Sequence, residues 1–540
     1  MKENKFELVE QYKMIKYIVY FLCSSVLFSI AGNAQQLESE SELLVKSPET
    51  IYSAVDANNN YVFVFRTKAQ YELVFFDAVH KKIGDVVIPI PTIQKSDTYL
   101  GIELNEDSCS IYSLNPRSNG IIQLNVARVG GGMSTKTIGH LAYTEKFLKC
   151  VSLNNAFYIL TTTQGKNQIE VHGIENSAIT KNTFSIEMPD LYKRLSSGNS
   201  LLNEETQGSV GIDAINYSIE NNVKSARSTK KIYAFEKYIC LTFDDPDYTH
   251  IIQIDLENNT ATYKQFLFSL EQGNTSSKKQ GNSFLHNQTL FRTTMSLEQM
   301  AFTVVDIETN QSHTTFYATP HNPMNFKNGP IIQENSSDKV RIIDDNATYF
   351  KRVLAGNLSI AVNQKDSSYI VEIGSFEEIV ANNNYNSPAV GRPSISIGMG
   401  MGMGGMGMGM GGMGMGMGGM GMGGMGGMGG MGYGGGTSPY NSYGWDSPGY
   451  YNGYSGYYPY NSSTTNIRTI YIHTMLNTST YEHQAGIVPI TLRERVSNFE
   501  TEIFKSQKPE HIRVIDFKDK IVIGYVIPNK KVFKQYSFYK

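Results

Sequence analysis

Apolar and polar residues alternate along most of this chain with a period of two rather than the 3.6 of a helix. Strand-like runs recur between turns rich in Asn, Asp, Gly and Ser, and they come in pairs joined by a few polar residues. The pattern predicts an all-β protein. The eight pairs are 61–67 with 71–78, 108–114 with 120–127, 156–162 with 167–174, 237–243 with 250–257, 288–294 with 300–307, 357–363 with 368–375, 468–474 with 485–492, and 520–526 with 532–539.

The pairs repeat at a regular spacing, because the second runs of the first three begin at 71, 120 and 167, in steps of 49 and 47 residues. A repeat of about 40 to 50 residues with several short strands resembles the β-propeller superfamily. No named propeller family fits, since the Gly-His…Trp-Asp, kelch and Asp-box signatures are missing and Trp445 lies outside the pairs. The resemblance implies a ring of seven or eight blades. A β-sandwich pair or an open β-solenoid is the alternative.

The two ends of the chain are expected to meet. The last pair ends at the last residues, so its blade lacks an outer strand. Residues 37–46 (LESESELLVK) could supply that strand and close the ring.

Two segments interrupt the repeats, and we expect them to be insertions that reach the rim or the faces of the ring. The first, about 190–229, is polar. The second, 379–465, is rich in Gly and Met and then in Tyr, and is expected to be disordered. This division assigns the repeats to 35–378 and 466–540.

The N-terminus resembles a secretory signal. Lys16 precedes an apolar run of about fifteen residues, and Gly32-Asn33-Ala34 suits cleavage after Ala34 (signal peptide 1–34). Met14 is an alternative start. The Ala-Gln-Gln junction resembles exported proteins of Bacteroidetes-type bacteria. We expect an exported protein of the periplasm, the outer-membrane surface or the extracellular space, with no transmembrane segment in the mature chain; an uncleaved membrane anchor is the alternative.

The net charge and the cysteines narrow the classes of partner and site that this chain can have. A net charge of −3 over 540 residues gives no basic footprint for nucleic acid. Three cysteines follow the signal, Cys109, Cys150 and Cys240, at wide spacing and partly in apolar runs. They are expected to be buried thiols rather than a disulfide framework or a zinc site.

Enzyme motifs are missing: there is no HExxH, GxSxG or Walker loop, and GMGGMG (402–407) matches GxGxxG by composition alone. FDDPDYTH (243–250) reads as a hairpin turn rather than a calcium loop. His172 is expected to be a satisfied or surface side chain in a strand. KSARSTKK (224–231) is expected to be a solvated basic loop.

The Gly/Met tract has three interpretations. It is a flexible spacer, because glycine has the largest backbone freedom. Alternatively, its thioethers bind Cu(I), for which MxM and MxxM spacing is suitable. The candidate metal ligands are Met399, Met401, Met403, Met406, Met408, Met410, Met413, Met415 and Met417.

The third interpretation is association, in which the tract and its aromatic continuation form a contact arm. The candidate arm residues are Tyr443, Trp445, Tyr450, Tyr451, Tyr454, Tyr457 and Tyr458.

The sequence therefore predicts an exported, non-enzymatic binding or scaffold protein of the cell envelope or extracellular surface, whose arm contacts a protein or a glycan. No cofactor is expected. One alternative is a glycan-active hydrolase or lyase with its site in the propeller channel. The other is a Cu(I)-binding envelope protein that uses the methionine tract.

Overall fold

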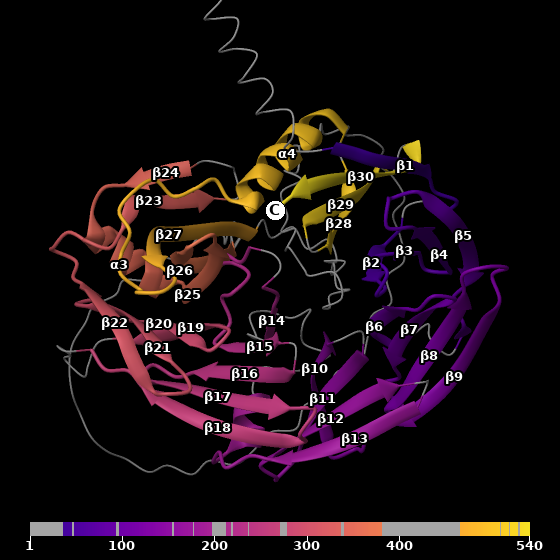
Figure 1. Cartoon of the computed structure of the whole chain (residues 1–540), viewed down its shortest axis with the longest axis horizontal. Helices are drawn as coiled ribbons and strands as arrows, with labels where there is room; N and C mark the ends of the chain where they lie inside the picture. The colour runs from indigo at the N-terminus through magenta and orange to yellow at the C-terminus, as the bar shows by residue number, and fades with distance from the viewer. Residues whose placement is uncertain are drawn as a thin grey trace, which may run out of the picture.

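The computed structural model shows a ring of seven sheets, each of four or five strands, arranged around a central axis (Figure 1). This is a seven-bladed β-propeller, which confirms the predicted fold class and decides between seven and eight blades. We number the blades 1 to 7 along the chain. The structure describes residues 36–45, 48–92, 97–153, 156–175, 178–196, 212–217, 220–235, 237–270, 278–335, 340–380, 465–507, 509–517, 519–527 and 530–540.

Blades 1 to 3 are four-stranded antiparallel meanders with the first strand nearest the axis and the last at the rim (Figure 1). Their two middle strands are the predicted pairs. The strands are β2 (Thr50–Val55), β3 (Tyr61–Arg66), β4 (Gln70–Phe76) and β5 (Lys82–Pro89); β6 (Thr98–Leu104), β7 (Ser108–Leu114), β8 (Gly120–Ala127) and β9 (Met133–His140); and β10 (Glu145–Leu153), β11 (Ala156–Thr163), β12 (Gln168–Glu175) and β13 (Ala178–Ser185).

Blades 4 and 5 follow the same plan, but blade 4 has an additional strand, β14, parallel to β15 on its axial side. The strands are β14 (Asp213–Ile215), β15 (Lys230–Ala234), β16 (Tyr238–Asp244), β17 (Tyr248–Asp255) and β18 (Thr260–Leu267); and β19 (Gln280–His286), β20 (Thr289–Met295), β21 (Met300–Asp306) and β22 (Gln311–Ala318).

Blade 6 departs from the plan, because its two outer strands precede its inner strands in the sequence. The order across the sheet is β24-β23-β27-β26-β25. The expected pairing of 468–474 with 485–492 is wrong: the first run belongs to β27, which pairs with β26, and the second run forms no strand. The strands are β23 (Asn328–Asn335), β24 (Val340–Ile343), β25 (Asn357–Lys365), β26 (Ser368–Val380) and β27 (Thr465–Asn477).

Blade 7 closes the ring with a strand from the other end of the chain. β1 (Gln36–Glu42) pairs antiparallel with β30 (Val532–Tyr539), so that Gln36 lies opposite Ser537 and Glu42 opposite Val532. The predicted closure is confirmed. The two inner strands of this blade are β28 (Glu510–Asp516) and β29 (Lys520–Ile527).

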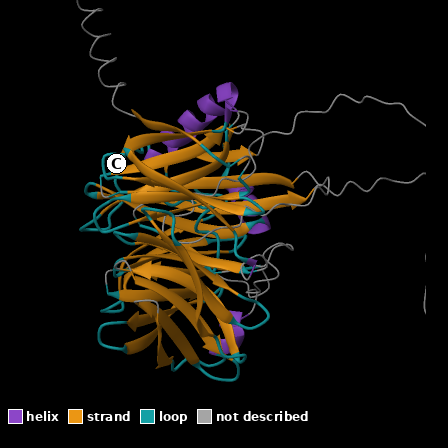
Figure 2. Ribbon diagram, turned by 90° about the vertical axis from the view of Figure 1, so that its right-hand side faces the viewer, coloured by secondary structure: helices purple, strands orange, loops and turns teal. Residues whose placement is uncertain are grey.

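Two of the three described helices lie on one face of the ring, which we call the helix face, and the third runs through the junction of blades 6 and 7 (Figure 2). The first joins blade 3 to blade 4, the second joins the outer strands of blade 6 to its inner strands, and the third joins blade 6 to blade 7. They are α2 (Leu191–Ser196), α3 (Asn346–Ala355) and α4 (Leu492–Gln507).

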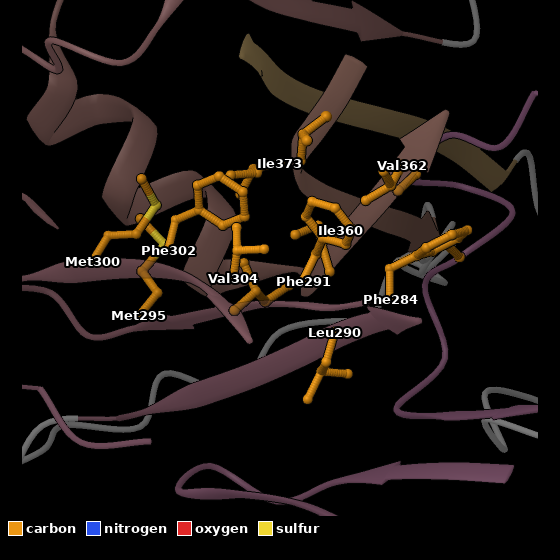
Figure 3. Packing of buried hydrophobic residues seen from close by; sticks show 14 of the residues in the cluster. Phe284, Leu290, Phe291, Met295, Met300, Phe302, Val304, Ile360, Val362 and Ile373 are labelled. Atoms are coloured by element: carbon orange, nitrogen blue, oxygen red, sulfur yellow. The ribbon is translucent and has the colours of Figure 1, made fainter. Parts of the chain in front are cut away.

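Apolar clusters fasten the blades to one another at the junctions 1–2, 2–3, 3–4, 4–5, 5–6 and 7–1. Figure 3 shows the junction of blades 5 and 6, where Phe291 and Phe302 approach Ile360 and Ile373. In the part of the chain that the structure describes, no such cluster joins blades 6 and 7. There, α4 covers the face of blade 7 instead, through Val496, Phe499 and other apolar residues.

We expect loss of the closing strand to open the ring at β30. A chain that begins after Glu42 should leave the β30 edge unpaired, and an unpaired edge recruits another chain. It should unfold at a lower temperature than a chain that begins after Ala34 and should self-associate on size-exclusion chromatography. A monomer with an unchanged unfolding temperature would show that β1 does not hold the ring closed.

Candidate functional site

The long insertion begins and ends at the tip of one hairpin. β26 and β27 pair continuously from Ser368 opposite Asn477 to Val380 opposite Thr465. The insertion therefore interrupts blade 6 itself rather than a connection between blades. β25 starts after α3 and the β25–β26 turn lies at the opposite face, so the tip of the β26–β27 hairpin lies at the helix face.

The predicted site residues all belong to this insertion. The nine candidate copper ligands, Met399 to Met417, and the seven candidate arm residues, Tyr443 to Tyr458, lie outside the described residues. The structure places the two ends of the insertion opposite each other. Copper binding by the methionines and partner contact by the aromatic residues remain predictions.

The hairpin is firmly seated in its sheet. β27 pairs with β26 on one side and β23 on the other. At Gly374 a Cβ atom would lie 1.9 Å from the carbonyl oxygen of Ile470, so only glycine allows this close approach of the two backbones. The insertion is thus carried by a central strand pair of blade 6.

On this hairpin and the adjoining β23, blade 6 carries a half-buried polar group of four side chains, which we call the Glu372 cluster: Glu334, Glu372, Tyr471 and His473. The Tyr471 hydroxyl donates to Glu334 Oε1 at 2.7 Å. His473 Nε2 lies 3.4 Å from Glu372 Oε2, and both side chains are 14% exposed. None of the four belongs to the apolar cluster that joins blades 5 and 6.

Helix α4 adds a third carboxylate to this environment. Thr491 and Glu494 form a reciprocal cap at the start of the helix: Thr491 N–H donates to Glu494 Oε2 at 2.9 Å, and Glu494 N–H donates to Thr491 Oγ1 at 3.1 Å. The charge of Glu494 acts on both Tyr471 and His473. Charged and polar groups therefore occupy the side of blade 6 that is near α4.

The protonation of His473 follows from this arrangement. Burial lowers the pKa of the imidazole, but the hydrogen bond and charge of Glu372, with the charges of Glu494 and Glu334, outweigh burial and raise it above its ordinary value. Burial and the same carboxylates raise the pKa of Tyr471, which stays a neutral donor. The cluster therefore favours the charged form of His473 over the neutral ring.

The predicted polar insertion at 190–229 contributes a segment to the same region, and its described part is packed rather than solvated. Val223 N–H donates to Glu372 Oε1 at 2.9 Å. Asn221 N–H donates to Asn363 Oδ1 at 2.6 Å, and the Asn363 side-chain amide donates back to Asn221 O at 2.8 Å. The Arg227 guanidinium stacks 4.5 Å from the Phe376 ring. This segment connects blade 4 to the inner strands of blade 6.

A second polar group, on blade 3, contains a hydroxyl, an imidazole and a carboxylate, and it fails as a catalytic relay. His172 Nε2 lies 2.8 Å from Glu145 Oε2 and 3.3 Å from Thr161 Oγ1. A relay needs one ring nitrogen for the nucleophile and the other for the acid, whereas here one nitrogen serves both. Lys181 also pairs with Glu145. The prediction that His172 is a satisfied strand residue is confirmed.

The turn FDDPDYTH is a hairpin turn, as predicted, and its cation is an arginine from the next blade. Arg292 Nη1 donates to Asp244 Oδ1 at 2.9 Å, and Arg292 Nη2 donates to the carbonyl oxygens of Asp245 at 2.7 Å and Pro246 at 3.1 Å. Both the Arg292 and Asp244 side chains are fully buried. A Cβ at Gly281 would lie 2.1 Å from Arg292 Nη2, so this glycine makes room for the guanidinium.

Metal and thiol chemistry find little support in the described part of the chain. Its His, Cys, Asp and Glu side chains form no group of three or more that could hold a metal ion. Cys109, Cys150 and Cys240 are buried and form no disulfide, as predicted. Burial raises the pKa of the Cys240 thiol to about 12, which keeps it unreactive.

Comparisons with known proteins give only distant likenesses. No family model matches the chain, and no curated protein does. An ACO/RPE65 chimera aligns at 10% identity over 50% of this chain and 60% of its own, with a TM-score of 0.27. The Dos1 propeller aligns at 9% identity over 62% and 71%, with a TM-score of 0.27. The WD40 domain of SCAP from fission yeast aligns at 12% identity over 61% and 71%, with a TM-score of 0.23.

The first of these alignments spans less than two thirds of the matched protein. All three are too distant to argue from, so the assignment as a propeller rests on the strand order of this chain. Among the described helices, none is long and apolar enough to cross a bilayer.

We expect His473 to make stability depend on pH. Because its pKa in the folded state is raised, its contribution is complete below the pKa of the unfolded chain and is lost as pH rises through the folded value. Urea unfolding at pH 6 and pH 9 should show a smaller fall in the free energy of unfolding for H473Q than for the unmodified chain. The exposed His140→Gln is the control. An equal fall in the free energy of unfolding for the unmodified chain and both variants would contradict a raised pKa of His473 in the folded state.

We expect R292M to cost about 3–5 kcal/mol of unfolding free energy, because it removes the nearest cation of the buried Asp244 carboxylate and leaves Lys231, 4.0 Å away, as the more distant partner. The double variant D244N/R292M should recover part of this loss. K237M, which breaks the exposed Lys237–Glu257 pair, should leave stability unchanged. If millimolar calcium stabilised the unmodified chain, the assignment of Arg292 as the cation bound by this turn would be wrong.

Proposed function

We propose that this chain is an exported binding or scaffold protein in which the propeller presents residues 381–464 as a contact arm. A propeller-like ring suits a binding or scaffold role in general, although the fold by itself assigns no function. The observation that carries the proposal is the continuous pairing of β26 and β27 up to Val380 and Thr465. The arm leaves and re-enters the sheet at facing residues, so the ring does not need it to close.

The composition of the arm supports contact rather than catalysis. Methionine side chains adapt to varied apolar surfaces, and tyrosines stack on sugar or aromatic rings while their hydroxyls stay hydrated. Only Arg392 and Asp446 carry charge between 379 and 466, so the arm can approach a surface without a large electrostatic cost. We propose a protein or glycan at the cell surface as its partner.

Export is supported by the place of the predicted cleavage site. Cleavage after Ala34 leaves β1 whole, since that strand begins at Gln36. A mature chain would therefore keep the strand that closes the ring.

Non-enzymatic action is proposed because the polar groups described above are used within the fold. Arg292 binds the β16–β17 turn of blade 4, the Glu145 carboxylate pairs with His172 and Lys181, and Glu372 accepts from Val223. The channel enzyme and the copper protein remain the competing proposals, and the experiment below separates them from the contact arm.

Replacement of residues 381–464 by Asn-Gly should leave the fold intact, because these two residues form the tight turn that joins paired strands. The unfolding temperature and circular dichroism should match those of the full chain, while attachment to isolated cell envelopes should be lost. If the shortened chain still attached to cell envelopes, the contact-arm proposal would be wrong.

Two arm variants make the test specific. Substitution of serine for the aromatic residues at 443, 445, 450, 451, 454, 457 and 458 should abolish attachment if stacking carries it. Leucine at the nine methionines from 399 to 417 should abolish Cu(I) uptake under a competing chelator if thioethers bind the metal. Loss of attachment in the leucine variant only when Cu(I) is supplied would favour the copper protein.

A further inference from the structure

Blade 6 ends at its rim in a strand edge that carries two exposed apolar side chains. Within the described residues, β24 (Val340–Ile343) pairs with β23 on one side only. Val340 is 64% exposed and Ile342 is 63% exposed, and both lie on one face of the strand because they are two residues apart. Figure 1 places β24 at the outer margin of the ring. An open edge of this kind is a template for pairing with another strand.

Most of the other outer strands carry residues that discourage such pairing. β9, β13 and β18 each contain a lysine, and β5 ends in Pro89; the lysines are Lys136, Lys181 and Lys264. Lysine and proline on an edge strand hinder the approach of a second strand. Among the described outer strands, β24 is the one in which two apolar side chains are more than half exposed. Blade 6 therefore has the strand edge that is best suited to association.

The charges along this edge have opposite signs at its two ends. Arg341 is the second residue of β24, and Asp344 and Asp345 follow the last residue of the strand. All three residues are exposed. Two copies of the edge that run antiparallel would bring the basic end of each copy against the acidic end of the other. The edge is therefore complementary in charge to a second copy of itself.

We propose that two copies of this chain pair antiparallel through their β24 strands and form a dimer in which the two blades 6 make one continuous sheet. A two-fold dimer uses the same patch on both copies. Directly opposed residues of an antiparallel pair have the same orientation of their backbone groups, so the two-fold axis passes beside one residue of each strand. Ile342 at this position lies opposite the partner's Ile342. Val340 and Ile342 of both copies then form one apolar strip.

The small size of the contact predicts a reversible dimer. β24 has four residues, whereas a stable interface buries roughly 800 Å² on each partner. We therefore expect a dissociation constant of about 10–100 µM rather than a permanent dimer. Salt should weaken the association further, because it screens the exposed charges of Arg341 and Asp344.

The antiparallel arrangement determines how the two rings face. Its two-fold axis reverses the direction of the strands, so the helix faces of the two copies point to opposite sides. The tip of the β26–β27 hairpin lies at the helix face. With residues 381–464 as contact arms, the dimer carries one arm on each side and can join two surfaces. This consequence rests on the contact-arm proposal, whereas the dimer itself does not.

Sedimentation equilibrium of the chain that begins after Ala34 tests the dimer. We expect the mean mass to rise toward twice that of the monomer between about 5 and 200 µM protein. I342K should weaken the association about tenfold or more, because it sets two like charges opposite each other at the centre of the pair. L267K is the matched control, since Leu267 is 64% exposed on β18, the outer strand of blade 4. This variant should associate as the unmodified chain does, and both variants should keep its unfolding temperature.

Charge reversal tests the antiparallel direction of the pair. R341E and D344K should each associate more weakly than the unmodified chain, because each sets like charges against one another at both ends of the pair. An equimolar mixture of the two variants should dimerise again, since the reversed end of one copy then meets the reversed end of the other. Asp345 is left unchanged because it caps α3.

Four results would overturn the proposal. The first is a chain that stays monomeric at about 200 µM, and the second is equal association of I342K and L267K. The third is a mixture of R341E and D344K that associates no better than either variant alone. The fourth is a dimer that forms only after residues 381–464 are replaced by Asn-Gly, which would show that the insertion occupies the β24 edge. None of these measurements depends on attachment to cell envelopes, so failure of the dimer and failure of the contact arm are distinguishable.

Discussion

Every blade except blade 6 has two apolar faces, and both can be buried only if the ring closes. The middle strands make this requirement severe: five of six residues in β3 and six of seven in β4 are buried. A blade at an open end would expose one such face and one strand edge. The β1–β30 pairing removes both problems at once, and Leu43 and Val45 extend it into the apolar cluster shared by blades 7 and 1. The rest of the architecture depends on this one ladder.

The closed ring still has one unusual junction. Between blades 6 and 7, α4 stands where two sheet faces meet directly elsewhere, and it buries Val496 and Phe499 against blade 7. The side of blade 6 near α4 carries the Glu372 cluster instead of an apolar cluster. Blade 6 also bears the insertion and draws its outer strands from upstream. The blade that departs most from the common plan is thus the one that carries the long insertion.

The sequence predicted the ring because the middle strands carry the strongest signal. Inner and outer strands were harder to predict from the sequence. For example, β9 (MSTKTIGH) is largely exposed and has few apolar residues. The run 485–492 was wrongly predicted to be a strand because most of its residues are apolar. However, Pro489 has no amide hydrogen to donate to a neighbouring strand, and Ile487 is almost fully exposed. In the sites, the turn at 243–250 was predictable from Asp and Pro. Its partner Arg292 was not, because it lies 48 residues beyond Asp244 and only the packing of blades 4 and 5 brings them together.

The geometry of the blades places the long insertion on the helix face. In an up-and-down blade the connections to the next inner strand and the turn between the second and third strands lie at the same end. The tip of the β26–β27 hairpin therefore lies at the helix face, where the inner strands of the other blades also begin. A partner held by the arm would therefore approach the ring from the helix face. The opposite face carries the start of β1 and the end of β30, the two strands whose pairing closes the ring.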